Sequence, residues 1–172
     1  MRNFIIAAMT LIALAHAHVL GFDFGNTFFK ITLVKPGSPF SIVENTTSKR
    51  KTESMLTIAD DVRLWSADAF NGAARFPKTT FANVAGYLGK EFDDEELKQI
   101  RGDKFILNDF VKDERGLVAF QTFSLDSKDE QTIYYSEEVF AMILKYGRTL
   151  SEIQAEGATV KDAVITIPSY FN

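Results

Sequence analysis

Apolar residues alternate or cluster in three short segments near the start of the chain, residues 19–23, 28–34 and 40–43. β-Branched and aromatic side chains dominate all three segments, which is typical of strands. The links are short and rich in turn residues: Gly25-Asn26 joins the first two segments, and residues 36–39, Pro-Gly-Ser-Pro, join the next two. Short links of this kind connect antiparallel strands, so the pattern predicts a three-stranded meander.

The middle of the chain has a mixed pattern. Residues 55–58 and 62–65 predict a small hairpin that turns at residues 60–61. Ser66 is then placed to cap a helix that ends before Pro77. We therefore expect a hairpin followed directly by a short helix.

A second short helix is expected over residues 79–88, where Gly89 would end it. The acidic stretch at residues 91–96 is typical of a solvated helix start. Alternation within residues 105–123 predicts two strands on either side of a turn at residues 113–116.

The last third of the chain returns to a simple pattern. Ser136 can cap a long helix from residue 137 to about residue 155, and Gly157 can end it. The apolar residues expected on one face of this helix are Phe140, Ile143, Leu144, Leu150 and Ile153. Residues 163–167 then predict a fully buried strand that ends at Pro168 and joins the meander through a crossover.

The first residues have the pattern of a secretory signal peptide. Arg2 supplies the positive charge, residues 4–14 form an apolar run interrupted only by Thr10, and residues 15–17 read Ala-His-Ala, a cleavage signature. The run is shorter than the roughly 20 residues that a membrane helix needs. We predict cleavage after residue 17, which would expose the Asn45-Thr46-Thr47 sequon to glycosylation in the endoplasmic reticulum (ER).

Composition removes several classes of function. The chain has 172 residues, 46% of them apolar, and a formal net charge of -4, which favours neither nucleic acid nor an anionic membrane surface as a partner. It contains no cysteine, so thiolate metal sites and cysteine nucleophiles are excluded. The only histidines, His16 and His18, lie at the predicted cleavage point, and no metal site is expected there.

The residues with the clearest chemical potential lie at positions 21–27, which read Gly-Phe-Asp-Phe-Gly-Asn-Thr. Asp23 would end a strand, and the glycine turn that follows would present backbone N–H groups near the same point. Backbone N–H groups cradle phosphate oxygens, and a carboxylate can hold Mg²⁺ through its water shell. An ordinary hairpin turn explains the same residues equally well.

Four stretches resemble the seventy-kilodalton heat-shock chaperone family, in that family's order and near its spacing: residues 21–27, 88–94, 135–139 and 165–172. Together they span nearly the whole chain after the predicted signal peptide. The signal peptide, residues 49–52 and residues 75–77 look more like the large ER-lumenal class of glucose-regulated and hypoxia up-regulated members.

The resemblance implies an α/β fold: residues 18–172 would form the N-terminal lobe of an actin-like, ribonuclease H-like ATPase domain. A small α+β subdomain would be inserted at about residues 48–130. The family's second phosphate loop, catalytic carboxylates and adenosine pocket would lie after Asn172, so the fold is expected to be incomplete at the C-terminus. We expect the isolated chain to be poorly soluble or to depend on a partner.

The resemblance also implies ATP or ADP with Mg²⁺ as cofactors. The cofactor-binding residues would be Asp23, Gly25, Asn26, Thr27 and Phe28, with Asp23 facing the metal, and no catalytic residue is assigned. The implied function is that of an ATP-binding chaperone, or of a nucleotide-exchange cochaperone, that assists protein folding. The chain would be located in the ER lumen or be secreted. Its partners would be a standard ER chaperone and unfolded polypeptide clients, with no nucleic acid and no membrane.

The sequence departs from the family pattern at several positions. Asn26 stands in place of a threonine and Phe28 in place of a tyrosine. Ala85 stands where standard members carry a lysine that contacts the γ-phosphate, so we expect weak hydrolysis. Lys90 could substitute for it, although a solvated role is favoured. Pro168 matches a proline that couples nucleotide state to the client domain, or it simply ends a strand.

The same residues are compatible with two other classes of function. Another actin-like phosphotransferase, such as a sugar kinase, would also place Asp23 beside a phosphate. A secreted interaction module without enzymatic activity would keep the fold and lose the nucleotide.

Overall fold

The computed structural model describes residues 18–59, 62–101, 108–123 and 131–167. The predicted signal peptide, the turn at residues 60–61 and Pro168 lie outside these residues. The chain divides into two compact units. The first comprises Met1–Phe24, Phe29–Lys51 and Gly147–Asn172, and the second comprises Gly25–Phe28 and Thr52–Tyr146. Among the helices of the described residues, none has the length and apolar character needed to cross a membrane.

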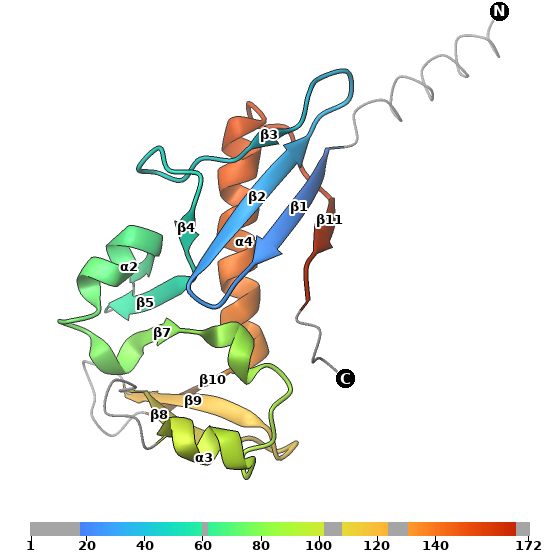
Figure 1. Cartoon of the computed structure of the whole chain (residues 1–172). Helices are drawn as coiled ribbons and strands as arrows, with labels where there is room; N and C mark the ends of the chain where they lie inside the picture. Colours follow the sequence, from blue (N-terminus) through green and yellow to red (C-terminus); the bar gives the residue numbers. More distant parts are fainter. Residues whose placement is uncertain (1–17, 60–61, 102–107, 124–130, 168–172) are drawn as a thin grey trace, which may run out of the picture. The chain divides into compact units, whose positions relative to one another are not determined.

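The first unit is built on a sheet with the strand order β11-β1-β2-β3 (Figure 1). Its strands are β1 (Val19–Phe24), β2 (Phe28–Val34), β3 (Ser41–Ile42) and β11 (Asp162–Ile165). β1 pairs antiparallel with β2, and β2 pairs antiparallel with β3, which confirms the predicted meander. β11 pairs parallel with β1, which confirms the predicted crossover strand.

Alternation along β1 and β2 places one side of the hairpin in the core of this unit. Leu20 and Phe22 of β1 are buried, as are Ile31 and Leu33 of β2. The last turns of α4 (Ser136–Gln154) cover these side chains. The approach is closest at Gly147, where an added Cβ would come within 2.6 Å of the Phe22 ring and 2.8 Å of Ile31 Cδ1.

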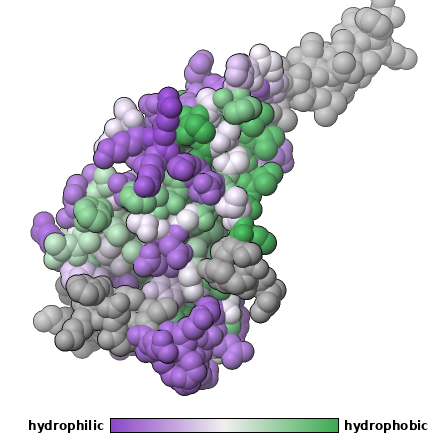
Figure 2. Space-filling view, viewed as in Figure 1, coloured by the Kyte–Doolittle hydropathy of each residue, from purple (hydrophilic) through white to green (hydrophobic). Residues whose placement is uncertain are grey.

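The expectation that residues 163–167 are fully buried is wrong. All four residues of β11 are exposed, and Val164 keeps 68% of its surface accessible. An apolar run predicts burial when elements cover both faces of a strand, and no described element covers β11. Figure 2 shows the resulting apolar side chains along this strand.

The second unit contains two antiparallel three-stranded sheets, with the orders β6-β5-β7 and β10-β9-β8. The strands of these sheets are β5 (Met55–Ala59), β6 (Val62–Trp65), β7 (Thr80–Ala82), β8 (Asp109–Lys112), β9 (Val118–Phe123) and β10 (Gln131–Tyr135). The short strand β4 (Thr52–Glu53) belongs to neither of them. The helical segments of this unit besides α4 are α2 (Ser66–Gly72), α3 (Glu95–Arg101) and the 3₁₀ turns η1 (Pro77–Thr79) and η2 (Val84–Tyr87). The β5–β6 and β8–β9 hairpins confirm two predictions.

The helix predicted over residues 79–88 is wrong. β7 occupies the first part of this segment and pairs with β5, which satisfies its backbone in a sheet. Asn83 then adopts a left-handed conformation, with φ at 55°, and only the short turn η2 follows before Gly89. The tertiary pairing with β5 therefore overrides the local helical pattern.

The predicted cap at Ser66 is also wrong. Ser66 is the first residue of α2, with φ at 51°, and the preceding Trp65 makes no side-chain cap hydrogen bond. The Ser66 hydroxyl instead donates to the Glu53 carboxylate and accepts the Glu53 N–H at 3.3 Å. This serine ties α2 to β4 rather than capping the helix.

The long helix predicted from residue 137 to about residue 155 is confirmed by α4. Its buried positions include Val139, Ile143, Gly147 and Leu150, which follow the helical repeat. Ile153, which was expected on this face, is 69% exposed. Gly157, with φ at 86°, follows the helix as expected of a C-terminal stop.

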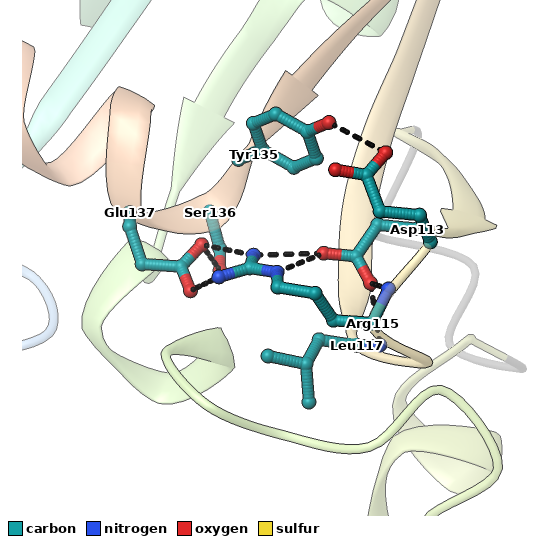
Figure 3. A network of polar contacts seen from close by, with 7 residues as sticks. Asp113, Arg115, Leu117, Tyr135, Ser136 and Glu137 are labelled. Carbon is teal, nitrogen blue, oxygen red and sulfur yellow. Dashed lines mark hydrogen bonds and ion pairs between the residues drawn. The ribbon is translucent and has the colours of Figure 1, made fainter.

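A polar cluster joins the β8–β9 turn to the start of α4 within the second unit (Figure 3). Arg115 binds Asp113 at 2.7 Å and Glu137 at 3.0 Å. The other oxygen of Asp113 accepts the backbone N–H groups of Arg115 and Leu117, both at 2.8 Å. We call Asp113, Arg115 and Glu137 the turn cluster.

Burial is the largest single influence on both carboxyl groups of the turn cluster, and it opposes their ionisation. For Asp113, hydrogen bonds from the Leu117 N–H and from Arg115 outweigh burial, so its pKa is lowered. For Glu137, hydrogen bonds from Arg115, from its own backbone N–H and from Ser136 likewise lower the pKa. Both groups therefore stabilise the fold in their charged form.

Replacing Gly147 tests the close helix–sheet contact. Gly147→Val should lower the free energy of unfolding by about 1–3 kcal/mol, because the added methyl groups must displace Phe22 and Ile31. Urea denaturation followed by circular dichroism measures this change. Ala141→Val, at an exposed position of the same helix, measures the cost of a β-branched side chain in α4 without the contact. A loss at Gly147 no larger than the loss at Ala141 would contradict the contact.

Replacing Arg115 tests the turn cluster. The pKa values of Asp113 and Glu137 are lower in the folded chain than in the unfolded chain, where they are about 4. Their contribution to stability is therefore fully present above about pH 4, and it is lost as the pH falls through the pKa values of the folded chain. Arg115→Met should therefore lower the melting temperature at pH 7, and the difference from the unmodified chain should narrow towards pH 2. Arg63→Met, on exposed β6, is the control. A difference that does not change with pH would argue against the ionic role.

Candidate functional site

Asp23 lies on β1 and is exposed, so its carboxylate does not point into the apolar core. The alternation of β1 explains this, because the neighbouring Phe22 and Phe24 occupy the buried face. Across the hairpin, Asp23 lies opposite Lys30 in the strand register. The side chain is therefore accessible to a ligand from solvent.

The turn that follows Asp23 in the chain is held by a backbone hydrogen bond. The Gly25 N–H donates to the Phe28 carbonyl at 3.0 Å, so it is not available to a phosphate. A Cβ at Gly25 would lie only 2.9 Å from the same oxygen, so the turn itself requires glycine here. The glycine therefore has a structural role in the turn itself, and its place among the cofactor-binding residues stays a prediction.

Asn26 and Thr27 form the tip of the turn, and both are exposed. Neither backbone N–H donates to another described residue. Phe28 is half-buried and begins β2. Two of the expected donors are therefore accessible, at the positions where the sequence predicted them.

Ser54 fixes the turn from a distant position in the sequence. Its hydroxyl donates to the Gly25 carbonyl at 2.9 Å, and its backbone N–H donates to the Thr27 carbonyl at 2.9 Å. Ser54 is 2% exposed and lies 29 residues along the chain from Gly25. No local sequence signal marks a contact over this separation.

The predicted motif is divided between the two units: Asp23 belongs to the first, and residues 25–28 belong to the second. Each part has one kind of group that a magnesium-bound phosphate uses. The accessible N–H groups fit phosphate oxygens, and the exposed carboxylate fits a hydrated Mg²⁺, which usually keeps several waters. The described residues contain no cluster of three or more acidic or histidine side chains that could hold a metal directly.

Ala85 lies on η2 and is 6% exposed, and its methyl side chain carries no charge. Lys90, the possible substitute, binds the Glu96 carboxylate at 2.7 Å and lies 4.0 Å from Asp94. Asp94 also accepts the Glu96 N–H at the start of α3. Lys90 thus belongs to an ion-pair group near α3, where Figure 2 shows hydrophilic side chains.

The turn cluster is the other dense group of charges among the described residues. Arg115 forms ion pairs with both Asp113 and Glu137 within the cluster. We therefore assign it a structural role and not a ligand site.

Comparison with known proteins gives related sequences named hypoxia up-regulated protein 1. The protein of Xenopus laevis is 36% identical over 169 residues, which is 95% of this chain and 25% of that protein. The protein of Xenopus tropicalis is 38% identical over 155 residues, which is 90% of this chain and 23% of that protein. The protein of Gallus gallus is 38% identical over 156 residues, which is 90% of this chain and 15% of that protein.

The chain thus spans a quarter or less of the length of these relatives. A family model described as Hsp70 protein matches residues 19–172, which is nearly all of the sequence after the predicted signal peptide. The match and the identities agree with the four stretches that resemble this family, and the chain belongs to the Hsp70 family.

Proposed function

We propose that this chain forms part of an ATP-binding molecular chaperone of the ER and supplies one phosphate-facing loop of its nucleotide site. The nucleotide-binding domain of the Hsp70 family has an actin-like ATPase fold, and the α/β arrangement of the first unit agrees with it. The observation that carries the proposal is the pair of accessible N–H groups on Asn26 and Thr27. These residues come two and three positions after the end of β1, close in sequence to the exposed Asp23.

The proposed roles follow from the chemistry of each group. The N–H groups of Asn26 and Thr27 would donate to phosphate oxygens, and Asp23 would hold the waters of a bound Mg²⁺. The metal would neutralise phosphate charge when bound. Gly25 and Ser54 would keep the turn in a conformation that leaves these donors exposed.

We propose that hydrolysis is weak. Phosphoryl transfer depends on positioned charges around the γ-phosphate, and Ala85 has none to offer. Lys90 is already bound by Glu96. Binding without fast turnover suits a nucleotide-exchange cochaperone, which would act on a standard ER chaperone and on unfolded polypeptide clients.

The proposed location is the ER lumen, or secretion from it. The pattern of residues 1–17 supports entry into that compartment, and the name of the relatives, hypoxia up-regulated protein 1, supports a role in the response to stress. Family membership favours the chaperone over a sugar-kinase type of phosphotransferase and over an interaction module without nucleotide. The assignment of residues 18–172 as one lobe, with an insertion at about residues 48–130, stays a prediction.

Replacing Asp23 tests the metal role in the full-length polypeptide. Asp23→Asn should weaken Mg²⁺-ATP binding about tenfold or more, because a charge-assisted contact is worth roughly 1.5–3 kcal/mol. Isothermal titration with Mg²⁺ and with EDTA separates the metal-dependent part. Asp162→Asn is a matched control, since Asp162 is exposed on β11 opposite Val19, at the other end of β1. Equal effects of both variants would reject the metal role.

Replacing Ala85 tests the proposed cause of weak hydrolysis. Ala85→Lys should raise single-turnover ATP hydrolysis by about tenfold or more in the full-length polypeptide, since one positioned donor can contribute that much. Ala85→Met supplies similar length without charge and should not raise the rate. Because Ala85 is buried, melting curves of both variants must show an intact fold. Fast turnover in the unmodified protein would overturn the proposal.

A further inference from the structure

The loop that follows β3 in Figure 1 contains one buried polar residue, Asn45, around which it is organised. Every other residue from Glu44 to Lys51 is exposed, whereas Asn45 is 6% exposed. Asn45 is also the acceptor residue of the Asn45-Thr46-Thr47 sequon. The residue that a glycan would modify is therefore the one that the folded loop encloses.

The side-chain oxygen of Asn45 accepts three hydrogen bonds. They come from the Thr47 N–H at 3.0 Å, the Thr47 hydroxyl at 2.9 Å and the Lys49 N–H at 3.0 Å. The side-chain nitrogen of Asn45 donates to the Lys51 carbonyl at 3.4 Å. Both ends of the amide are thus used inside the loop, as buried polar groups require.

The backbone closes the same loop. The Asn45 N–H donates to the Lys49 carbonyl at 2.9 Å, and the Ser48 N–H donates to the Asn45 carbonyl at 2.9 Å. Ser48 takes a left-handed conformation, with φ at 57°, which turns the chain back towards Asn45. Removing the Asn45 amide would leave several of these groups without their partner.

Glycan transfer would act on the nitrogen that this loop holds. The transfer forms a bond between Asn45 Nδ2 and the anomeric carbon of a lipid-diphosphate-linked oligosaccharide. It breaks the bond from that carbon to the diphosphate, which leaves with the lipid, and the amide loses one proton. The product carries a bulky, solvated sugar on a side chain that is 6% exposed and whose nitrogen is hydrogen-bonded in the folded chain.

We infer that Asn45 is the structural anchor of this loop, and that a glycan on Asn45 and the native loop exclude each other. The sequon accepts a glycan only in a chain that has not closed the loop. Occupancy of Asn45 thus marks chains that were modified before folding and that do not reach the native structure. The inference is independent of the nucleotide proposal, since it concerns neither Asp23 nor residues 25–28.

The variant Thr46→Asn places a second acceptor beside the first. The substitution leaves the Asn45 sequon intact. It adds a second sequon, Asn-Thr-Ser, over residues 46–48, whose acceptor stands at the exposed position 46. The full-length polypeptide is translated into ER microsomes behind a signal peptide of established function, so entry does not depend on residues 1–17. Site-specific mass spectrometry then measures occupancy separately in the monomeric, protease-resistant fraction and in the aggregated fraction.

We expect a glycan at position 46 of the variant in the monomeric fraction, with Asn45 at least tenfold less occupied there than position 46. A synthetic peptide of residues 41–51 should accept a glycan at Asn45, because it has no fold to enclose the amide. A glycan on Asn45 in monomeric, protease-resistant chains would overturn the inference.

Limited trypsin digestion tests the anchor without any glycan. The basic run Lys49-Arg50-Lys51 is exposed, but Asn45 binds the backbone of its first and last residues. Asn45→Ala should speed cleavage at this run about tenfold or more, because cleavage then needs less loop opening. Thr46→Ala is the matched control and should cleave at the rate of the unmodified chain. Equal rates for both variants would overturn the anchor role.

Discussion

The first unit depends on β1, because this strand is paired along both edges and is packed on one face only. β2 pairs with one edge of β1, β11 pairs with the other, and α4 packs against its buried face near Gly147. Side chains alternate between the two faces of a strand, and Phe22 and Phe24 are buried on one face. Asp23, which lies between them, must therefore point to the opposite, exposed face. The same pairing that stabilises the sheet thus brings the carboxylate to the surface.

Elements with strong local patterns were predicted correctly from the sequence. The meander, the β5–β6 and β8–β9 hairpins and α4 all combine a clear period with turn residues at their ends. Such signals depend on a few neighbouring residues, and in these elements the tertiary contacts agree with the local preference. Residues 79–88 show the opposite case, because pairing with β5 takes up a segment whose own pattern favoured a helix.

The errors in burial have a common cause. A pattern of apolar residues shows that a segment can be buried, but the neighbours that cover it decide whether it is. Among the described residues nothing covers β11, and Ile153 lies off the buried side of α4, which Leu150 and Ser151 mark. Ser66 is a related case, because Glu53, 13 residues away, takes the hydroxyl that a local cap would have used.

The turn that carries the candidate site was predictable from the sequence, but the hydrogen bonds that hold it were not. Asn26 and Thr27 lie at the turn tip where the motif put them, and Asp23 is exposed as a ligand would require. The sequence could not show that the Gly25 N–H closes the turn, nor that Ser54 holds two of its carbonyls. Both facts depend on hydrogen bonds whose partners a linear motif does not specify.

Asn45 shows why such bonds matter for reading a motif. The tripeptide Asn45-Thr46-Thr47 is complete as a sequon, yet its amide makes the hydrogen bonds that close a loop. The amide nitrogen of Asn45 can either donate a hydrogen bond within the loop or carry a glycan. These two uses require opposite surroundings, because a sugar must be solvated, whereas Asn45 is 6% exposed in the folded loop. The same argument applies to Gly25, where the needs of the turn account for the glycine before any ligand is considered. A motif residue supports a functional assignment only for those of its atoms that the fold leaves unused, and here these are the Asp23 carboxylate and the N–H groups of Asn26 and Thr27.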